Sequence, residues 1–170
     1  KGEKGMTYIE FVRPLPRLIV AGAGHVGRAV ARLGRLLDFS VTVIDDRAEY
    51  ASRDNVPEAD EIVVGEFGEA IANVEYSSEN YFVIVTRGHQ KDGEALQAAL
   101  GKPAAYLGMI GSKTKVETMR REFLRKGWDT EQEWAGIHTP IGLDIGSKTV
   151  EEIAVSIAAE LVQVRAGRRK

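Results

Sequence analysis

The sequence contains no cysteine. This absence excludes a disulfide scaffold, a cysteine-ligated zinc or iron–sulfur site, and a thiol nucleophile or persulfide carrier within the chain. Long apolar runs are also missing, since no stretch approaches the roughly 20 residues of a membrane span. The charged start, residues 1–4, does not have the pattern of a signal peptide. We therefore expect a cytoplasmic protein with no membrane partner.

The chain also has no large excess of positive or negative charge. The 170 residues carry a formal net charge of −2, with basic and acidic residues mixed along the chain. No overall electrostatic field therefore favours nucleic acid as a partner. The length and the apolar content of 44% suit one hydrophobic core and leave no room for a second full domain. We expect an extended arm or linker over 1–16 and a single domain over 17–170.

Residues 18–27 form a short apolar run that leads into three closely spaced glycines. Gly22 suits a tight turn after a buried strand, Gly24 admits the close approach of a phosphate, and Gly27 lets the following helix pack on the strand. The free N–H groups at the helix start, together with its dipole, form an anion site. The pattern predicts a strand over 17–21 and a helix over about 25–37. A purely structural use of the glycines, in strand–helix packing, is the alternative.

A second apolar run follows this helix and ends in Asp45. Asp45 lies close to the position, roughly 20 residues after the first glycine, that is expected of the acid holding a ribose hydroxyl. Such an acid favours NAD over NADP, although the nearby Arg47 weakens this preference. Asp46 points to the opposite face from Asp45, so the two carboxylates do not act as a pair.

Strands and helices continue to alternate along the rest of the chain. The apolar patterns predict strands over 61–64, 81–86 and 104–108, and helices over 92–100, between Ser112 and Gly127, and from Thr149 through Val164. This alternation demands a parallel sheet. We predict an α/β, Rossmann-like, doubly wound fold of three layers (αβα). Its mostly parallel sheet has the strand order 3-2-1-4-5, with room for a short sixth strand near Ile137.

Ligands of such a sheet bind beyond the carboxyl ends of the strands, where the strand order reverses. The loops predicted at that edge hold all three histidines of the chain. Because no pair of them has the spacing typical of a metal site, we expect His25 and His89 to donate hydrogen bonds to an anionic ligand or to act as acid/base groups. A structural use of such histidines is the alternative. The candidate cofactor-binding residues are Gly22, Gly24, His25, Gly27, Asp45, Asp46, Arg47, Arg87, His89, Asp92, Gly111, Ser112, Lys113, His138 and Asp144.

Residues 108–113 have glycines like those of a phosphate loop, but in the wrong order. A Walker motif places lysine before serine or threonine, whereas Ser112 precedes Lys113 here. What remains is a helix N-terminus that either holds an anion or has a plain N-cap beside a solvated lysine. No Ser-His-Asp order, nucleophile elbow or pair of catalytic carboxylates stands out. The residues thus identify no catalytic centre.

Five segments, in this order, are similar to one known family: residues 22–27, 45–47, 86–92, 106–113 and 138–160. Over residues 17–165 the chain resembles the C-terminal Rossmann domain of the XdhC/CoxI family, accessory proteins for xanthine dehydrogenase and carbon monoxide dehydrogenase. The resemblance implies a maturation factor for a molybdenum hydroxylase, and it favours a cofactor-binding chaperone over a catalyst. Such a factor binds the molybdenum cofactor, as molybdopterin or its dinucleotide, helps its sulfuration by a cysteine desulfurase, and inserts it into the apoenzyme.

The same resemblance implies that the glycine loop holds a pterin phosphate or a nucleotide and that the loop histidines face this ligand. Two other functions stay open on the residues: an NAD(H)-dependent oxidoreductase and a nucleotide-binding regulatory domain. A homodimer formed through the apolar last helix and the loop tryptophans, Trp128 and Trp134, is a further expectation.

Overall fold

The structure is a computed structural model that describes residues 15–128 and 131–168. Its five strands are all parallel and form one sheet in the order β3-β2-β1-β4-β5. The strands are β1 (Arg17–Ala21), β2 (Ser40–Asp45), β3 (Glu61–Val64), β4 (Asn80–Ile84) and β5 (Tyr106–Met109). The helices are α1 (His25–Leu36), α2 (Phe67–Ala72), α3 (His89–Ala99), α4 (Lys113–Lys126), α5 (Glu131–Trp134) and α6 (Val150–Gly167). The predicted Rossmann-like fold and strand order are confirmed.

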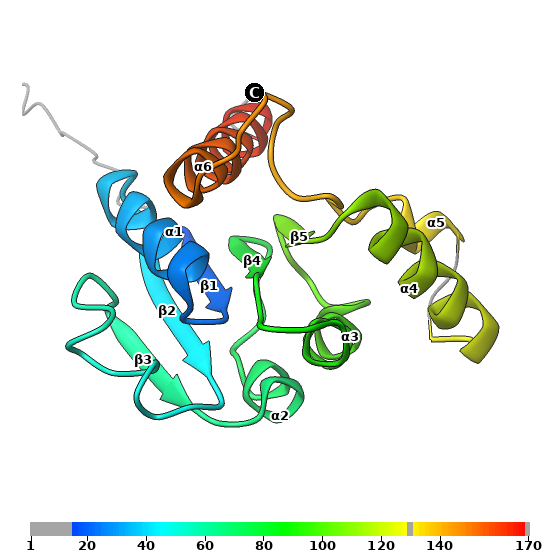
Figure 1. Cartoon of the computed structure of the whole chain (residues 1–170), viewed down its shortest axis with the longest axis horizontal. Helices are drawn as coiled ribbons and strands as arrows, with labels where there is room; N and C mark the ends of the chain where they lie inside the picture. Colours follow the sequence, from blue (N-terminus) through cyan, green and yellow to red (C-terminus); the bar gives the residue numbers. More distant parts are fainter. Residues whose placement is uncertain (1–14, 129–130, 169–170) are drawn as a thin grey trace, which may run out of the picture.

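Helices cover both faces of the sheet and make three layers (Figure 1). Alternate residues of each central strand point to opposite faces. Leu18 and Val20 pack in a core cluster with residues of α1 and α6. Ile19 and Ala21 pack in a second cluster with residues of α2, α3 and α4. Since both faces of the strands are covered, the central strands read as continuous apolar runs.

The sixth strand predicted near Ile137 is reduced to one isolated bridge between Gly108 and His138. The segment leaves the sheet edge immediately afterwards, because Pro140 has no N–H to donate and Gly142 takes a φ of +93°. Two short helices, α2 and α5, have no counterpart among the predicted elements. Helix α3 begins at His89 rather than at 92, with Gly88 as its N-cap.

The predicted dimer surface is only partly present in the described residues. Trp134 is 6% exposed and packs edge-on against Phe123, so the expectation that both tryptophans lie on a surface is wrong. Trp128 is partly exposed and meets the other edge of Phe123. The homodimer itself stays a prediction. The arm predicted over 1–16 falls almost entirely outside the described residues, and each helix within them is too short or too polar to cross a membrane.

Candidate functional site

Two glycines fix the turn between β1 and α1. Gly22 has a φ of +112°, and a Cβ at Gly27 would overlap the carbonyl oxygen of Gly22. Gly24, the N-cap of α1, differs from both, because no atom lies within 4 Å of the place where its Cβ would be. Gly22 and Gly27 are therefore required by the fold, whereas the backbone at Gly24 faces space that a ligand can fill.

The N-terminus of α1 presents an anion site toward this space. Its N-cap glycine makes no side-chain hydrogen bond, and its first turn carries no acidic residue. The first N–H groups and the positive end of the helix dipole are thus left for an external anion. Helix α4 differs, because the hydroxyl of Ser112 accepts a hydrogen bond from the N–H of Lys115 at 3.3 Å. The N-cap alternative for Ser112 is what the structure shows, and Lys113 is exposed beside it.

Asp45 at the end of β2 is buried and holds the glycine loop. Its carboxylate accepts hydrogen bonds from the N–H of Ala23 at 2.8 Å and from the backbone and guanidinium of Arg47. Burial raises the pKa of Asp45, but the hydrogen bonds from Arg47 and Ala23 outweigh it and bring the pKa below its ordinary value. Both oxygens are occupied internally, so these contacts support a positioning role for Asp45. Its role toward a ribose stays a prediction.

Asp46 offers the free acceptor that Asp45 does not. Its side chain is 7% exposed, and its Oδ2 accepts a hydrogen bond from Arg87 at 3.1 Å. Its Oδ1 is buried and has no hydrogen-bond partner, the nearest cation being the Arg47 Nε at 3.8 Å. The ammonium of Lys91, which the sequence did not single out, lies 3.8 Å from Oδ2. Because an unpaired buried acceptor is costly, a donor group of a ligand would stabilise this position.

A second buried carboxylate, Asp92, fixes the loop between β4 and α3. It accepts hydrogen bonds from the N–H and hydroxyl of Thr86, at 3.0 and 2.6 Å, and pairs with the ammonium of Lys115. Burial raises the pKa of Asp92, and these contacts offset it only in part. Asp92 therefore shapes the loop rather than facing a ligand. Helix periodicity gave no signal for Lys115, because its partner lies on another helix.

His89 and Arg87 in the same loop are partly exposed. The imidazole of His89 lies 3.9 Å from Glu122 of α4, and the guanidinium of Arg87 reaches Asp46 across the carboxyl ends of β4 and β2. The structure thus brings together Asp46, Arg47, Arg87 and Lys91. It leaves Asp144 exposed, with no hydrogen bond to the described residues, and places Gly111 against the side chain of Val116.

His138 lies apart from this group. Its bridge to Gly108 puts it one strand beyond β5, three strand spacings or about 14 Å from β1. Its Nδ1 lies 3.0 Å from Glu160 of α6, which also accepts hydrogen bonds from the hydroxyl of Tyr106 and the N–H of Gly142. Burial raises the pKa of Glu160, but the three donors outweigh it and lower the pKa. The structure does not join His138 and the glycine loop in one crevice.

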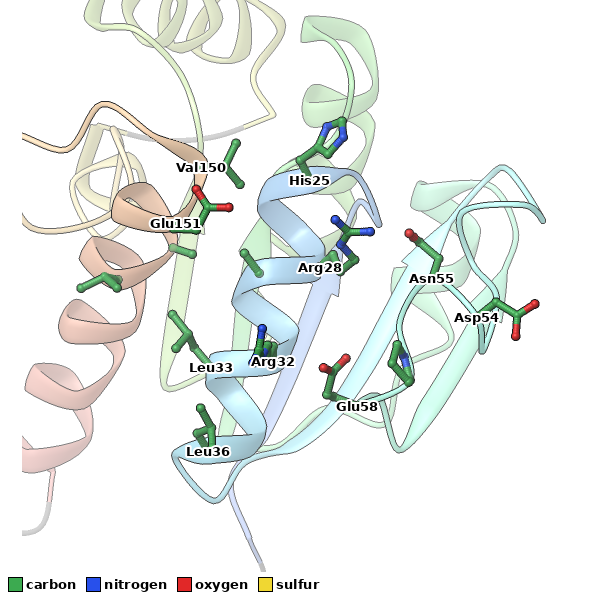
Figure 2. Close-up of a pocket in the computed structure, with 14 residues that line it drawn as sticks. His25, Arg28, Arg32, Leu33, Leu36, Asp54, Asn55, Glu58, Val150 and Glu151 are labelled. Carbon is green, nitrogen blue, oxygen red and sulfur yellow. The ribbon is translucent and has the colours of Figure 1, made fainter.

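A cavity of about 630 Å³ lies along α1, and we call it the α1 cavity (Figure 2). Of the predicted site residues, His25 alone lines it. A smaller cavity of about 210 Å³ is lined by His138 near the end of α3. The two histidines therefore face different hollows. The α1 cavity is lined by His25, Arg28, Ala29, Arg32, Leu33, Leu36, Asp54, Asn55, Pro57, Glu58, Val150, Glu151, Ala154 and Val155.

Three comparisons with known proteins agree with this architecture. The family model described as the XdhC Rossmann domain matches residues 18–161. The uncharacterized protein YqeB of Escherichia coli K12 is 36% identical over 151 residues, which are 88% of this chain and 27% of that protein. A Bacillus subtilis protein named as a probable xanthine dehydrogenase subunit is 28% identical over 158 residues, 93% of this chain and 46% of that protein.

A solved structure is similar as well. The crystal structure of a xanthine dehydrogenase from Bacillus halodurans aligns with a TM-score of 0.79 and 30% sequence identity, covering 91% of this chain and 44% of that one. The chain thus spans between about a quarter and a half of the length of these relatives.

Proposed function

The chain belongs to the family of the XdhC Rossmann domain, and from this premise we propose that it acts as an accessory domain for a molybdenum hydroxylase of the xanthine dehydrogenase type. In this proposal the domain binds the molybdenum cofactor, presents it for sulfuration by a cysteine desulfurase, and passes it to the apoenzyme. Since the chain has no cysteine, the transferred sulfur would be carried by the desulfurase. The part of this domain is to bind the cofactor and to orient it.

The observation that carries this proposal is the open space at Gly24 before the uncapped N-terminus of α1. A phosphate of the cofactor would sit there, receiving hydrogen bonds from the first N–H groups of the helix. His25, which is exposed in the first turn, would add a hydrogen-bond donor. Asp45 supports the same site from behind by fixing the N–H of Ala23.

Asp46 fits the other end of such a ligand. A pterin ring presents amino and ring N–H donors, and the free Oδ1 of Asp46 is a buried acceptor at the carboxyl end of β2. The guanidinium of Arg87 and the ammonium of Lys91 lie against this carboxylate and hold it in place. When bound, the cofactor supplies the molybdenum chemistry, while this chain holds the phosphate and the ring and keeps them oriented.

Calorimetric titration of the protein with molybdopterin under anaerobic conditions tests the proposal. We expect Gly24→Val to reduce affinity at least tenfold, because its side chain would extend into the phosphate position from a Cβ site that is open in the free protein. Gly88→Val is the matched control, since Gly88 is the N-cap of α3 and also has no atom within 4 Å of its Cβ position. Equal losses in both variants, or no binding by the wild type, would contradict the proposal.

NAD(H) binding is a second candidate, favoured by one observation. Asp46 has a free acceptor at the end of β2, where an acid that binds a ribose hydroxyl is found in dinucleotide-binding folds. Saturable quenching or enhancement of NADH fluorescence, lost in Asp46→Asn, is the expected result of this alternative. Absence of NADH binding in the same titration rules it out. Asp45→Ala is not used, because it would loosen the glycine loop itself.

A further inference from the structure

We propose that the α1 cavity binds the phosphorylated nucleoside half of a two-part ligand whose first phosphate lies at the glycine loop. This inference rests on the proposed function and specifies its ligand as the dinucleotide form of the cofactor. The cavity begins at His25 in the first turn of α1 and continues along the helix to Leu36. It therefore starts in the first turn of the helix whose N-terminus receives the first phosphate.

The walls of the cavity come from three parts of the chain. Figure 2 shows Arg28 and Arg32 on α1 beside the 54–58 segment, with Glu151 of α6 on the other side of the helix. Asn55 ties the 54–58 wall to the glycine loop, because its amide donates to the carbonyl oxygens of Ala23 at 2.9 Å and of Tyr50 at 2.8 Å. A ligand that reaches from the glycine loop into the α1 cavity would thus contact two segments that Asn55 holds together.

The charged side chains that line this cavity make no ion pair with one another or with other described residues. The side chains of Arg28 and Arg32 make no hydrogen bond or ion pair with any described residue. Other arginines of the same chain do, for example Arg35 with Asp60 and Arg47 with Asp45. Two unpaired guanidinium groups one helical turn apart on one face offer a fork of donors suited to phosphate.

The carboxylates of the cavity narrow the ligand class. Asp54, Glu58 and Glu151 also lack an ion pair within the described part of the chain, although they line the same space as the two arginines. Three carboxylates beside two guanidinium groups disfavour a polyanion. They suit a ligand with one phosphate and several hydroxyl or amino donors, because carboxylates only accept and guanidinium groups only donate. A nucleoside monophosphate has this combination, and its base can rest on the apolar side chains of Ala29 and Leu33.

The dimensions agree with a dinucleotide. The rise along the helix from His25 is about 4.5 Å to Arg28 and about 10 Å to Arg32, so the two arginines follow one another away from the helix N-terminus. The volume of about 630 Å³ lies within the range of ligand pockets. One phosphate at Gly24 would place the second beside Arg28 and the nucleoside toward Arg32 and Glu58.

Titrations of the full chain with molybdopterin, with its cytosine and guanine dinucleotides, and with CMP and GMP test this inference. We expect one dinucleotide to bind at least tenfold more tightly than molybdopterin. Arg28→Ala and Arg32→Ala should each weaken dinucleotide and mononucleotide binding about tenfold, as expected for a lost charged hydrogen bond, and leave molybdopterin affinity within twofold. Arg125→Ala, which removes an exposed arginine of α4 outside the cavity, is the matched control and should change neither affinity.

The results separate this inference from the proposed function. If molybdopterin binds and the dinucleotides bind no better, or if Arg28→Ala and Arg32→Ala leave dinucleotide affinity unchanged, the inference fails and the proposed function stands. If molybdopterin does not bind at all, the proposed function fails. In that case CMP or GMP binding that Arg28→Ala abolishes would still support the nucleotide site, and no nucleotide binding would overturn it as well.

Discussion

The glycine-loop region and the outer edge of the sheet are each tied together by a buried carboxylate. In the first region Asp45 holds the loop between β1 and α1, and in the second Glu160 of α6 holds β5 and the 138–142 segment. Their donors differ in kind. Both oxygens of Asp45 face only permanent donors, from Ala23 and Arg47, whereas Oε1 of Glu160 faces the imidazole of His138.

This difference shows that similar burial can give different tolerance to change. A histidine ring nitrogen either donates or accepts, according to its tautomer, but a backbone N–H and a guanidinium only donate. The glycine-loop region is therefore fixed by groups that cannot adapt. At the outer edge, the contact between Glu160 and His138 can adapt to a change of donor and acceptor. This region lies away from the proposed ligand.

The largest expected effect comes from adding a methyl group to each region. Gly27→Ala should lower the free energy of unfolding by about 3 kcal/mol or more, because its Cβ would overlap a backbone carbonyl that cannot move alone. Gly108→Ala should cost about 1–2 kcal/mol, because its Cβ would meet the ring of Tyr106, a side chain that can shift. Urea unfolding followed by circular dichroism measures both. Gly24→Ala, with open space, is the control, and a greater loss for Gly108→Ala would contradict the comparison.

The next largest effect is expected when each buried carboxylate is replaced by an amide, because the two regions should then lose different amounts of stability. In Asp45→Asn the new NH2 group faces two donors whichever way it is placed, so we expect a loss of about 2–3 kcal/mol. In Glu160→Gln the NH2 group can replace Oε1 and donate to Nδ1 of His138, while the remaining oxygen still accepts from Tyr106 and Gly142. We expect a loss of about 1 kcal/mol there, measured by the same unfolding experiment. Equal losses would show that the tautomer of His138 does not adapt.

The two regions also differ in how far the sequence predicts them. The bounds of β1 and β3 and the strand order follow from apolar runs and the parallel connections they require. The position of Asp45 follows from its short distance along the chain to the glycine loop. The apolar runs and the position of Asp45 are local signals, because they depend only on spacing along a short part of the sequence.

The outer edge has no such signal. Tyr106 and Glu160 are 54 residues apart and meet only because α6 returns to pack over the face that β5 presents. Lys115 and Asp92 likewise meet across two helices, and the four-residue helix α5 is too short for periodicity to show. The sequence placed His138 at the ligand edge because it follows the strand predicted near Ile137, and its bridge to Gly108 does lie one residue from the carboxyl end of β5. Spacing gave no sign that its ring pairs with Glu160 of α6.

The smallest expected effect is on the pH dependence of stability, and it follows from the signs of the pKa shifts. The lowered pKa values of Asp45 and Glu160 mean that each carboxylate stabilises the fold above pH about 4 and that this stabilisation is lost as the pH falls through the folded-state pKa. Asp92 has a raised pKa, so its contribution has the opposite sign: the fold gains stability as the pH falls through the window above pH about 4.

Urea unfolding at pH 6, 5, 4 and 3 tests these signs. Asp45→Asn should lose less stability than the wild type between pH 5 and 3, and Glu160→Gln should behave in the same way, because each variant lacks a carboxylate whose pKa is lowered by folding. Asp92→Asn should lose more than the wild type on acidification, because the opposing contribution is gone. Asp144→Asn, at an exposed position without a hydrogen bond to the described residues, should follow the wild type. A flatter profile for Asp92→Asn would mean that Lys115 holds the charged form of Asp92 more strongly than burial disfavours it.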